Sequence, residues 1–272
     1  LPMDSMGCDE MVNELVSDKH PSLRFALESA LLDLMHGGNQ IYYPGGFTRG
    51  LATIPINGLV WMGSFEFMKE QVDQKIKECY TCIKIKIGAI DFDLECDLLS
   101  YIREAYGKNI VVRVDANGAF SPQEVCSKLE RLSSFNIHSI EQPIKPGQFK
   151  IMRELSEQNL VPVALDEELI GCNQPEKMEQ LLDSIQPQYI VLKPTLLGGI
   201  KTTGDWINLA RLRKIEWWIT SALESNVGLN VLAQYTAGLD PHLEQGLGTG
   251  QLYHNNTPTK LSIEHARLHY KP

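Results

Sequence analysis

Five charged residues recur at regular intervals along the middle of the chain. Lys86, Asp115, Glu141, Asp166 and Lys193 each stand at or near the C-terminal end of a short apolar run, and subtraction gives spacings of 29, 26, 25 and 27 residues. Three neighbouring carboxylates repel one another unless a cation relieves them, and Mg²⁺ prefers such oxygen ligands. The set therefore favours a divalent metal site whose charge would help a nearby lysine act as a base.

Each acid also has an ordinary structural explanation when it is taken alone. Asp115 in "VDANG" is typical of a turn, Glu141 in "EQP" of a helix cap, and Asp166 in "LDEEL" of a helix N-terminus. Independent caps and turns would not be expected to place lysine, three acids and lysine in phase. The joint pattern therefore favours one site.

A second lysine precedes the first of the five, in the segment "TCIKIKIGAI" at residues 81–90. Side chains alternate along a strand, so Lys84 and Lys86 share one face and three isoleucines the other. An antiparallel strand with one wet face has this pattern too. A parallel barrel strand is buried on both sides, and there the two lysines would point into the barrel near the acids.

The elements that would position these residues follow a regular order. From about residue 52, short apolar runs alternate with amphipathic segments of helical length, which indicates βαβ units around a parallel sheet. The predicted strands are 52–62, 82–88, 110–118, 138–143, 161–168, 188–194 and 216–225, and the predicted helices include 91–107, 121–135, 148–159, 175–185, 199–214 and 226–238. Two short helices are expected within 8–36. We predict a closed (β/α) barrel with a weakly marked eighth position near 242–250; an open doubly wound sheet is the alternative, but no GxGxxG follows the first strand.

Composition narrows the class of protein. The 272 residues carry a net charge of −9, which argues against nucleic acid or an anionic membrane as the main partner. No apolar run is long enough to span a bilayer, and the first residues do not resemble a signal peptide. Cys79 and Cys82 form a CxxC, but no second pair or nearby histidine completes a zinc site. We expect a cytoplasmic enzyme or binding protein; the sequence leaves homo-oligomerisation open.

Six motifs in order carry a resemblance to a known family. "IKIKIG", "RVDANG", "SIEQP", "ALDEEL", "LKPTLLGG" and "SALESNVG" resemble the enolase superfamily, in its muconate-lactonizing branch, and are most similar to the o-succinylbenzoate synthases. The resemblance covers the chain from about residue 52. It implies an α/β fold, a modified TIM-type (β/α)7β barrel with a truncated N-terminal α+β capping domain: 1–51 as the remnant of that domain, 52–250 as the barrel and 251–272 as the return to the cap.

The resemblance also assigns roles. It implies Mg²⁺, with Mn²⁺ as the alternative, held by Asp115, Glu141 and Asp166. Lys86 would be the general base, Lys84 would lower the pKa of Lys86, and Lys193 would stabilise the enediolate. The implied partner is a small-molecule carboxylate substrate. The implied reaction is the syn dehydration of a hydroxycyclohexadiene carboxylate in menaquinone biosynthesis, catalysed by a carbon–oxygen lyase.

Substrate contacts are predicted from alternation and from the seventh strand end. Arg113 and Asn117 share the inward face with Asp115, although Arg113 could equally serve only to neutralise the acids. "SALESNVG" offers Ser221, Glu224 and Ser225, followed by a helix start that could bind a carboxylate. Gly198 and Gly199 are read as a cap of the next helix.

Other functions stay open at this stage. N-succinylamino-acid racemases and related epimerases resemble the synthases in their barrel, their lysine base and their metal, so they remain alternatives. Dipeptide epimerases resemble one another in an acidic DxD segment near the last strand, and this segment is absent after residue 221. The short region before the barrel leaves open how the site is closed from water. A catalytically silent barrel used as a binding module is the non-enzymatic alternative.

Overall fold

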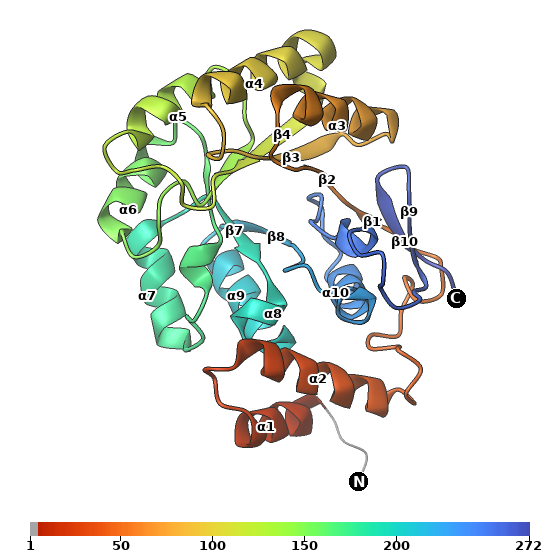
Figure 1. Ribbon diagram of the computed structural model, residues 1–272. Coiled ribbons are helices and arrows are strands. Elements are labelled where there is room, and N and C mark those ends of the chain that lie inside the picture. Colours follow the sequence, from red (N-terminus) through yellow and green to blue (C-terminus); the bar gives the residue numbers. More distant parts are fainter. Residues whose placement is uncertain (1–4) are drawn as a thin grey trace.

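A seven-stranded parallel sheet forms the centre of the computed structural model, which describes residues 5–272 (Figure 1). Consecutive strands are neighbours throughout. Their bounds are β2 (Gly58–Val60), β3 (Cys82–Lys86), β4 (Val111–Asp115), β5 (Ser139–Glu141), β6 (Val163–Leu165), β7 (Tyr189–Leu192) and β8 (Glu216–Ile219). The sheet curls into a barrel-like α/β fold, and this confirms the predicted fold class.

Helices cover the outer face of the sheet, one after almost every strand (Figure 1). Their apolar residues recur at helical spacing, as in α7 (Pro175–Ile185), which buries Met178, Leu181, Leu182 and Ile185. The other helices of this layer are α3 (Phe65–Lys77), α4 (Phe92–Tyr106), α5 (Val125–Ser133), α6 (Phe149–Gln158), α8 (Pro194–Leu197), α9 (Ile200–Leu212) and α10 (Asn226–Gly238), and the short 3₁₀ turns are η1 (Gly107–Asn109), η2 (Glu167–Leu169) and η3 (Thr249–Gln251). The barrel helices predicted from the sequence are thus confirmed within a few residues at their ends.

Two residues, rather than an eighth strand, complete the barrel wall. Gly246 bridges Thr220 after β8, and Gln245 bridges Ile56 before β2, both in the parallel sense. Backbone N–H groups of Asn57 and Ser221 donate to the carbonyls of Gln245 and Gly246. The weakly marked eighth position predicted near 242–250 therefore exists as a pair of single bridges.

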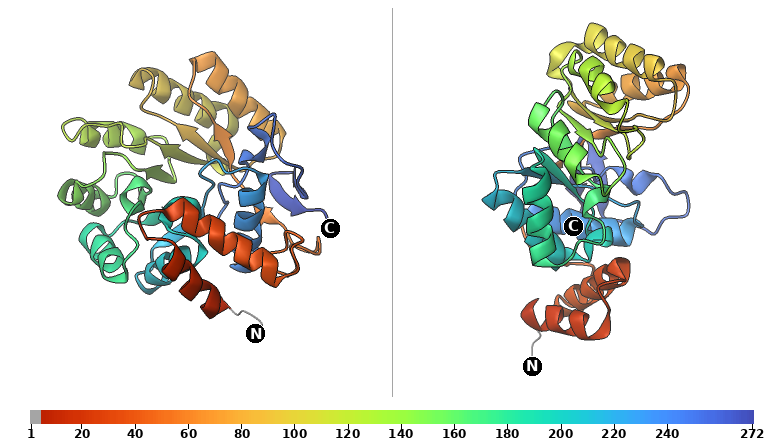
Figure 2. Two further views of the ribbon diagram at one scale, coloured as in Figure 1. Left: turned by 60° about the horizontal axis from the view of Figure 1, so that its bottom comes forward. Right: turned by 90° about the vertical axis from the view of Figure 1, so that its left-hand side faces the viewer.

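Segments from both chain ends lie outside the barrel. The N-terminal hairpin, which we define as α1 (Ser5–Leu15) and α2 (Pro21–Met35), forms a layer at one edge and packs against α8 (Figure 2). A small antiparallel sheet joins β1 (Ile54–Pro55), β10 (Arg267–Tyr270) and β9 (Leu261–Glu264). The domain boundaries expected at 51 and 250 stay predictions, and residues 1–4 of the first segment lie outside the described residues. No helix within residues 5–272 combines the length and apolarity that crossing a membrane requires.

Candidate active site

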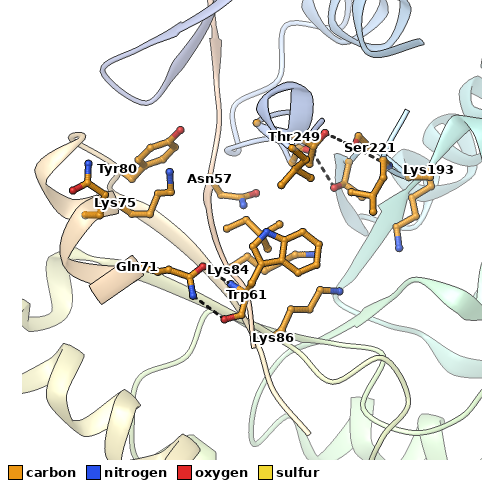
Figure 3. A pocket seen from close by; sticks show the side chains of 18 of the residues that line it. Asn57, Trp61, Gln71, Lys75, Tyr80, Lys84, Lys86, Lys193, Ser221 and Thr249 are labelled. Atoms are coloured by element: carbon orange, nitrogen blue, oxygen red, sulfur yellow. Dashed lines mark hydrogen bonds between the residues drawn. The ribbon is translucent and has the colours of Figure 1, made fainter. Parts of the chain in front are cut away.

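A cavity of about 840 Å³ opens at the C-terminal ends of the barrel strands. Its wall includes Lys84 and Lys86 of β3, Lys193 after β7, and Ser221 after β8 (Figure 3). In a parallel barrel the loops that follow the strands surround this mouth, so side chains far apart in sequence meet there. Of the five charged residues that the sequence predicts to meet here, Lys86 and Lys193 line the cavity.

Register places the first three charged side chains side by side. Lys86 is paired with Asp115 on β4, and Asp115 is paired in turn with Glu141 on β5. Asp166 directly follows β6 and Lys193 directly follows β7. All three carboxylates are buried, with exposures of 0 to 1%. The barrel therefore gathers three acids into one desolvated cluster.

Lysine ammonium groups neutralise this cluster. Lys84 Nζ lies 2.9 Å from Asp115 Oδ2 and 3.0 Å from Glu141 Oε2, while Lys86 Nζ lies 2.6 Å from the same Asp115 oxygen. Lys193 forms an ion pair with Asp166. Three lysines thus balance three acids, which offsets the high cost of burying charge.

Burial and neighbouring charge act in opposite directions on these groups. Burial favours neutral Lys84, but the carboxylates of Glu141, Asp115 and Asp166 together raise its pKa above the ordinary value. Burial also opposes the charge of Asp115, yet the ammonium groups of Lys84 and Lys86 lower its pKa. The pKa of Glu141 is raised well above its usual range, by burial first and then by the charge of Asp115. Glu141 is therefore the acid that most lacks a compensating cation.

The donor chemistry of the cluster fits a divalent cation. Asp115, Glu141 and Asp166 offer hard carboxylate oxygens, and Glu167, next to Asp166, has a buried Oε2 without a hydrogen-bond partner among the described residues. Within residues 5–272, however, no three acidic, histidine or cysteine side chains are already arranged as a metal cage. Lys84 stands between Asp115 and Glu141 instead. A cation at these carboxylates would therefore have to displace at least one ammonium group.

Asn117 contacts the site, as alternation along β4 predicted. Its Oδ1 accepts a hydrogen bond from Lys86 Nζ at 2.7 Å, and its Nδ2 donates to Glu167 Oε1 at 2.8 Å. Asn117 has a φ of +44°, a left-handed conformation that asparagine tolerates better than most residues. The side chain is thereby held where it can orient the Lys86 ammonium group.

Arg113 lies away from the cavity. Its guanidinium stacks 4.1 Å from the ring centroid of Trp218, and its Nη1 donates to the Glu244 carbonyl at 2.7 Å. It forms no ion pair with Asp115 or Glu141 and does not line the cavity. The structure therefore supports neither substrate contact nor neutralisation of the acids, the two roles expected for Arg113 from the sequence.

Of the substrate contacts predicted after β8, one lines the cavity and two do not. Ser221 lines the cavity and shares a 2.5 Å hydrogen bond with Thr249. Glu224 instead accepts from Thr195 Oγ1 and from the Ala222 N–H, so it joins the loops after β7 and β8. Ser225 precedes α10 without capping it through its side chain, and neither Glu224 nor Ser225 lines the cavity.

The start of α10 is already occupied by the protein itself. The Asn226 N–H donates to Asn256 Oδ1 at 2.8 Å. A ligand carboxylate would have to compete with Asn256 for this donor. One of the N–H groups that the sequence predicted to bind an anion is therefore not free.

One wall of the cavity was not predicted. Gln71 and Lys75 of α3 and Tyr80 before β3 line it, together with Asn57 and Trp61 (Figure 3). Gln71 holds the Trp61 backbone at both its N–H and its carbonyl, at 2.9 Å each. Gln71 and Lys75 are ordinary polar residues of an amphipathic helix, and nothing in their spacing distinguishes them from a solvated face.

Comparison with known proteins shows what this chain is similar to. Residues 67–271 match the model of the enolase C-terminal domain-like family. The o-succinylbenzoate synthase of Desulfotalea psychrophila is 55% identical over 247 residues, which make up 90% of this chain and 67% of the synthase. The crystal structure of MenC from Desulfotalea psychrophila superposes with a TM-score of 0.92 at 50% identity, over 97% of this chain and 74% of that one.

A more distant relative has a different activity. The L-amino acid-D/L-Glu epimerase of Francisella philomiragia is 27% identical over 173 residues, or 63% of this chain and 48% of the epimerase. This chain thus spans about two thirds of the length of the curated synthase and about half of that epimerase.

Proposed function

The chain belongs to the enolase C-terminal domain-like family of the enolase superfamily, and from that premise we propose that it is an o-succinylbenzoate synthase. The reaction would be the syn dehydration of 2-succinyl-6-hydroxy-2,4-cyclohexadiene-1-carboxylate to o-succinylbenzoate, a step of menaquinone biosynthesis. A cytoplasmic location belongs to the same proposal. The 55% identity to a synthase supports this substrate over those of the epimerases.

Lys86 is the proposed general base. Its ammonium group reaches into the cavity from the end of β3 and is held by Asp115 and Asn117. In its neutral form Lys86 takes the proton next to the substrate carboxylate, and it then returns that proton to the departing hydroxide. The C–H and C–O bonds break on the same face, a carbon–carbon double bond forms and water leaves. The ring becomes aromatic, which makes the second step favourable.

Lys193 is the proposed electrostatic partner on the opposite side. It follows β7, four strands from β3 in the sheet, and it also lines the cavity. Removing the proton places a second negative charge on the substrate carboxylate, and an ammonium group fixed beforehand stabilises that charge without reorganising. Burial opposes the charge of Lys193, but the carboxylates of Asp166 and Glu141 raise its pKa. The group therefore stays cationic, as this role requires.

A divalent metal is used by members of this superfamily, and we propose Mg²⁺ here, with Mn²⁺ as the alternative. Asp115, Glu141 and Asp166 would hold it, because their buried oxygens are the hard donors that Mg²⁺ prefers. The bound cation would supply electrostatic stabilisation of the developing anion. Before a cation binds, Lys84 lies between Asp115 and Glu141 and limits their mutual repulsion.

The observation that carries the proposal is that Lys86 and Lys193 contact one cluster of buried acids from opposite sides. Its test is an ultraviolet assay of the dehydration with Mg²⁺, repeated with EDTA and with Lys86→Ala. We expect turnover that EDTA abolishes and that Lys86→Ala lowers by about 10²- to 10⁴-fold. Lys108→Ala, which removes an exposed lysine, is the matched control. No turnover by the metal-loaded protein would contradict the assignment.

Racemisation of an N-succinylamino acid is the second candidate. It is favoured by the same pair of lysines, because bases on two faces of one carbon can invert it. Incubation of each N-succinylamino-acid enantiomer in D₂O would distinguish the two reactions. Deuterium incorporation with inversion, in the absence of dehydration, would replace the synthase with a racemase.

A further inference from the structure

A buried glutamate outside the barrel holds the loop that follows the Lys193 strand end. Glu28 of α2 is 6% exposed. Its carboxylate accepts the backbone N–H of Ile200 at 2.5 Å and that of Lys201 at 2.8 Å, across 172 and 173 residues of sequence. No ammonium or guanidinium group within the described part of the chain forms an ion pair with it. The charge therefore depends on these two N–H groups at the start of α9.

The loop is shaped to receive this carboxylate. Gly198 and Gly199 have φ values of +106° and +108°, which side-chain-bearing residues rarely adopt. A Cβ added to Gly199 would lie 2.3 Å from Glu28 Oε2, so only glycine leaves room for the carboxylate. The two glycines therefore do more than end α8: their conformation turns the N–H groups of α9 toward Glu28.

Only the short helix α8 separates this loop from Lys193. The Lys193 carbonyl accepts the N–H groups of Leu196 and Leu197, and the Gly199 N–H donates to the Pro194 carbonyl at 2.9 Å. α2 makes a second contact with this turn, in which Ser22 Oγ donates to the Thr195 carbonyl at 3.1 Å. A displacement of the Glu28 contact would thus be transmitted through one rigid turn to the Lys193 backbone.

We propose that Glu28 is a positioning residue for Lys193, through which the N-terminal hairpin fixes the side of the active site opposite Lys86. This inference rests on the proposed function. Glu28 touches neither the cavity nor the acids of the cluster, so it acts through the backbone of the α8–α9 turn. Small displacements of a group that stabilises charge cost rate steeply.

The same arrangement recurs at two other strand ends. Glu95 of α4 accepts the Gly88 N–H at 2.6 Å after β3, and Glu168 accepts the Gly147 N–H at 2.8 Å after β5. Both carboxylates are buried as well. Glu95 and Glu168 are both residues of the barrel, Glu168 in η2 of the next repeat, whereas Glu28 comes from the hairpin. Of these three glutamate-held loops, the one after Lys193 is therefore held from outside the barrel.

The test compares Glu28→Gln with Glu14→Gln, which changes an exposed carboxylate of the same hairpin. Glutamine keeps the shape but presents an NH₂ group to one of the two N–H donors. In the Mg²⁺-loaded protein we expect Glu28→Gln to lower kcat roughly 10- to 100-fold with KM changed less than about twofold. Peptides that span 194–203 should exchange amide hydrogens faster, and acetylation of Lys193, followed by mass spectrometry, should change its rate.

Each outcome decides a separate point. If Glu28→Gln leaves exchange over 194–203 and Lys193 acetylation like those of Glu14→Gln, Glu28 does not position Lys193. If the wild-type protein shows no turnover, the proposed function fails, while exchange and acetylation still test the positioning. Should Glu28→Gln not fold, Glu28→Asp, which keeps the charge but shortens its reach by one methylene, takes its place. An unchanged kcat in the folded variant would equally overturn the inference.

Discussion

Lys84 and Asp115 form a 2.9 Å ion pair between neighbouring strands, with side-chain exposures of 8% and 0%. Lys84 also lies 3.0 Å from Glu141. Because both acids are buried, removing this ammonium group would leave charge without a partner in a site that water hardly reaches. A pair in this setting is costly to break even where its net contribution to stability is small.

Lys84→Met should therefore destabilise the metal-free protein. We expect the free energy of unfolding in EDTA to fall by about 3–5 kcal/mol. Excess Mg²⁺ should stabilise the variant more than the wild type, since a cation at the carboxylates replaces the lost charge. Urea denaturation with EDTA and with Mg²⁺ measures both effects. Lys271→Met, which removes an exposed pair with Glu264, should change much less; equal stability of Lys84→Met and wild type would contradict the expectation.

Local patterns predicted the barrel and the acid cluster because both depend on short-range rules. Alternation along β3 and β4 decides which side chains point inward, and one βα repeat separates successive strand ends. Depth along the barrel follows no such rule: Arg113 points inward like Asp115 but lies two residues, about 6–7 Å, earlier on the strand. It therefore packs on Trp218 instead of reaching the cavity.

Contacts between distant segments were the part that the sequence could not supply. Glu28 is one acid on a mixed helix face, and its partners are backbone N–H groups more than 170 residues away. The paired glycines indicated a helix cap, which is correct for α9, but not the side chain that completes it. Backbone groups carry no sequence signal, so such a contact becomes visible only in the folded chain.

The stability of the protein should depend on pH through Glu28. Burial raises its pKa from 4.5 to about 7, although the N–H groups of Ile200 and Lys201 act in the opposite direction. The folded protein therefore keeps a proton that the unfolded chain has lost, so stability falls as pH rises from about 4.5 to about 7. The shift corresponds to a loss of about 3 kcal/mol.

Urea denaturation between pH 4 and pH 8 tests this dependence by comparing wild type with Glu28→Gln. The variant should gain stability relative to wild type as pH rises through that window, and the difference should level off above it. Asp9, Arg24 and Lys201 are the charged groups near Glu28, and the pKa of Asp9 is itself raised by burial. Asp9→Asn is therefore the necessary control. A constant difference between wild type and Glu28→Gln would rule out this titration.

Closure of the barrel should depend on the absence of a side chain at Gly246. An added Cβ would lie 2.1 Å from Thr220 Oγ1 and 3.2 Å from Thr220 Cα. Gly246→Ala must push the closing segment away from β8 and should lower the free energy of unfolding by about 1–3 kcal/mol. Gly238→Ala in α10 meets nothing within 4 Å and should be neutral or stabilising. Thermal unfolding compares the two, and equal melting temperatures would contradict this account of closure.

The two inward residues of β4 and its following turn should separate in function. Asn117 contacts Lys86 Nζ at 2.7 Å, so Asn117→Ala should lower kcat by about tenfold or more by releasing the base from its position.

Arg113→Met should leave kcat/KM within about threefold, because its guanidinium contacts Trp218 and the Glu244 carbonyl rather than the cavity. Arg113 Nε and Nη2 are buried without hydrogen-bond partners among the described residues, although Nη2 lies 3.9 Å from Glu244 Oε2. An apolar side chain of similar length removes these unsatisfied donors, which offsets part of the loss of the Trp218 and Glu244 contacts. Steady-state kinetics and urea denaturation of both variants measure these effects. A large loss of activity in folded Arg113→Met would instead place its guanidinium at the substrate.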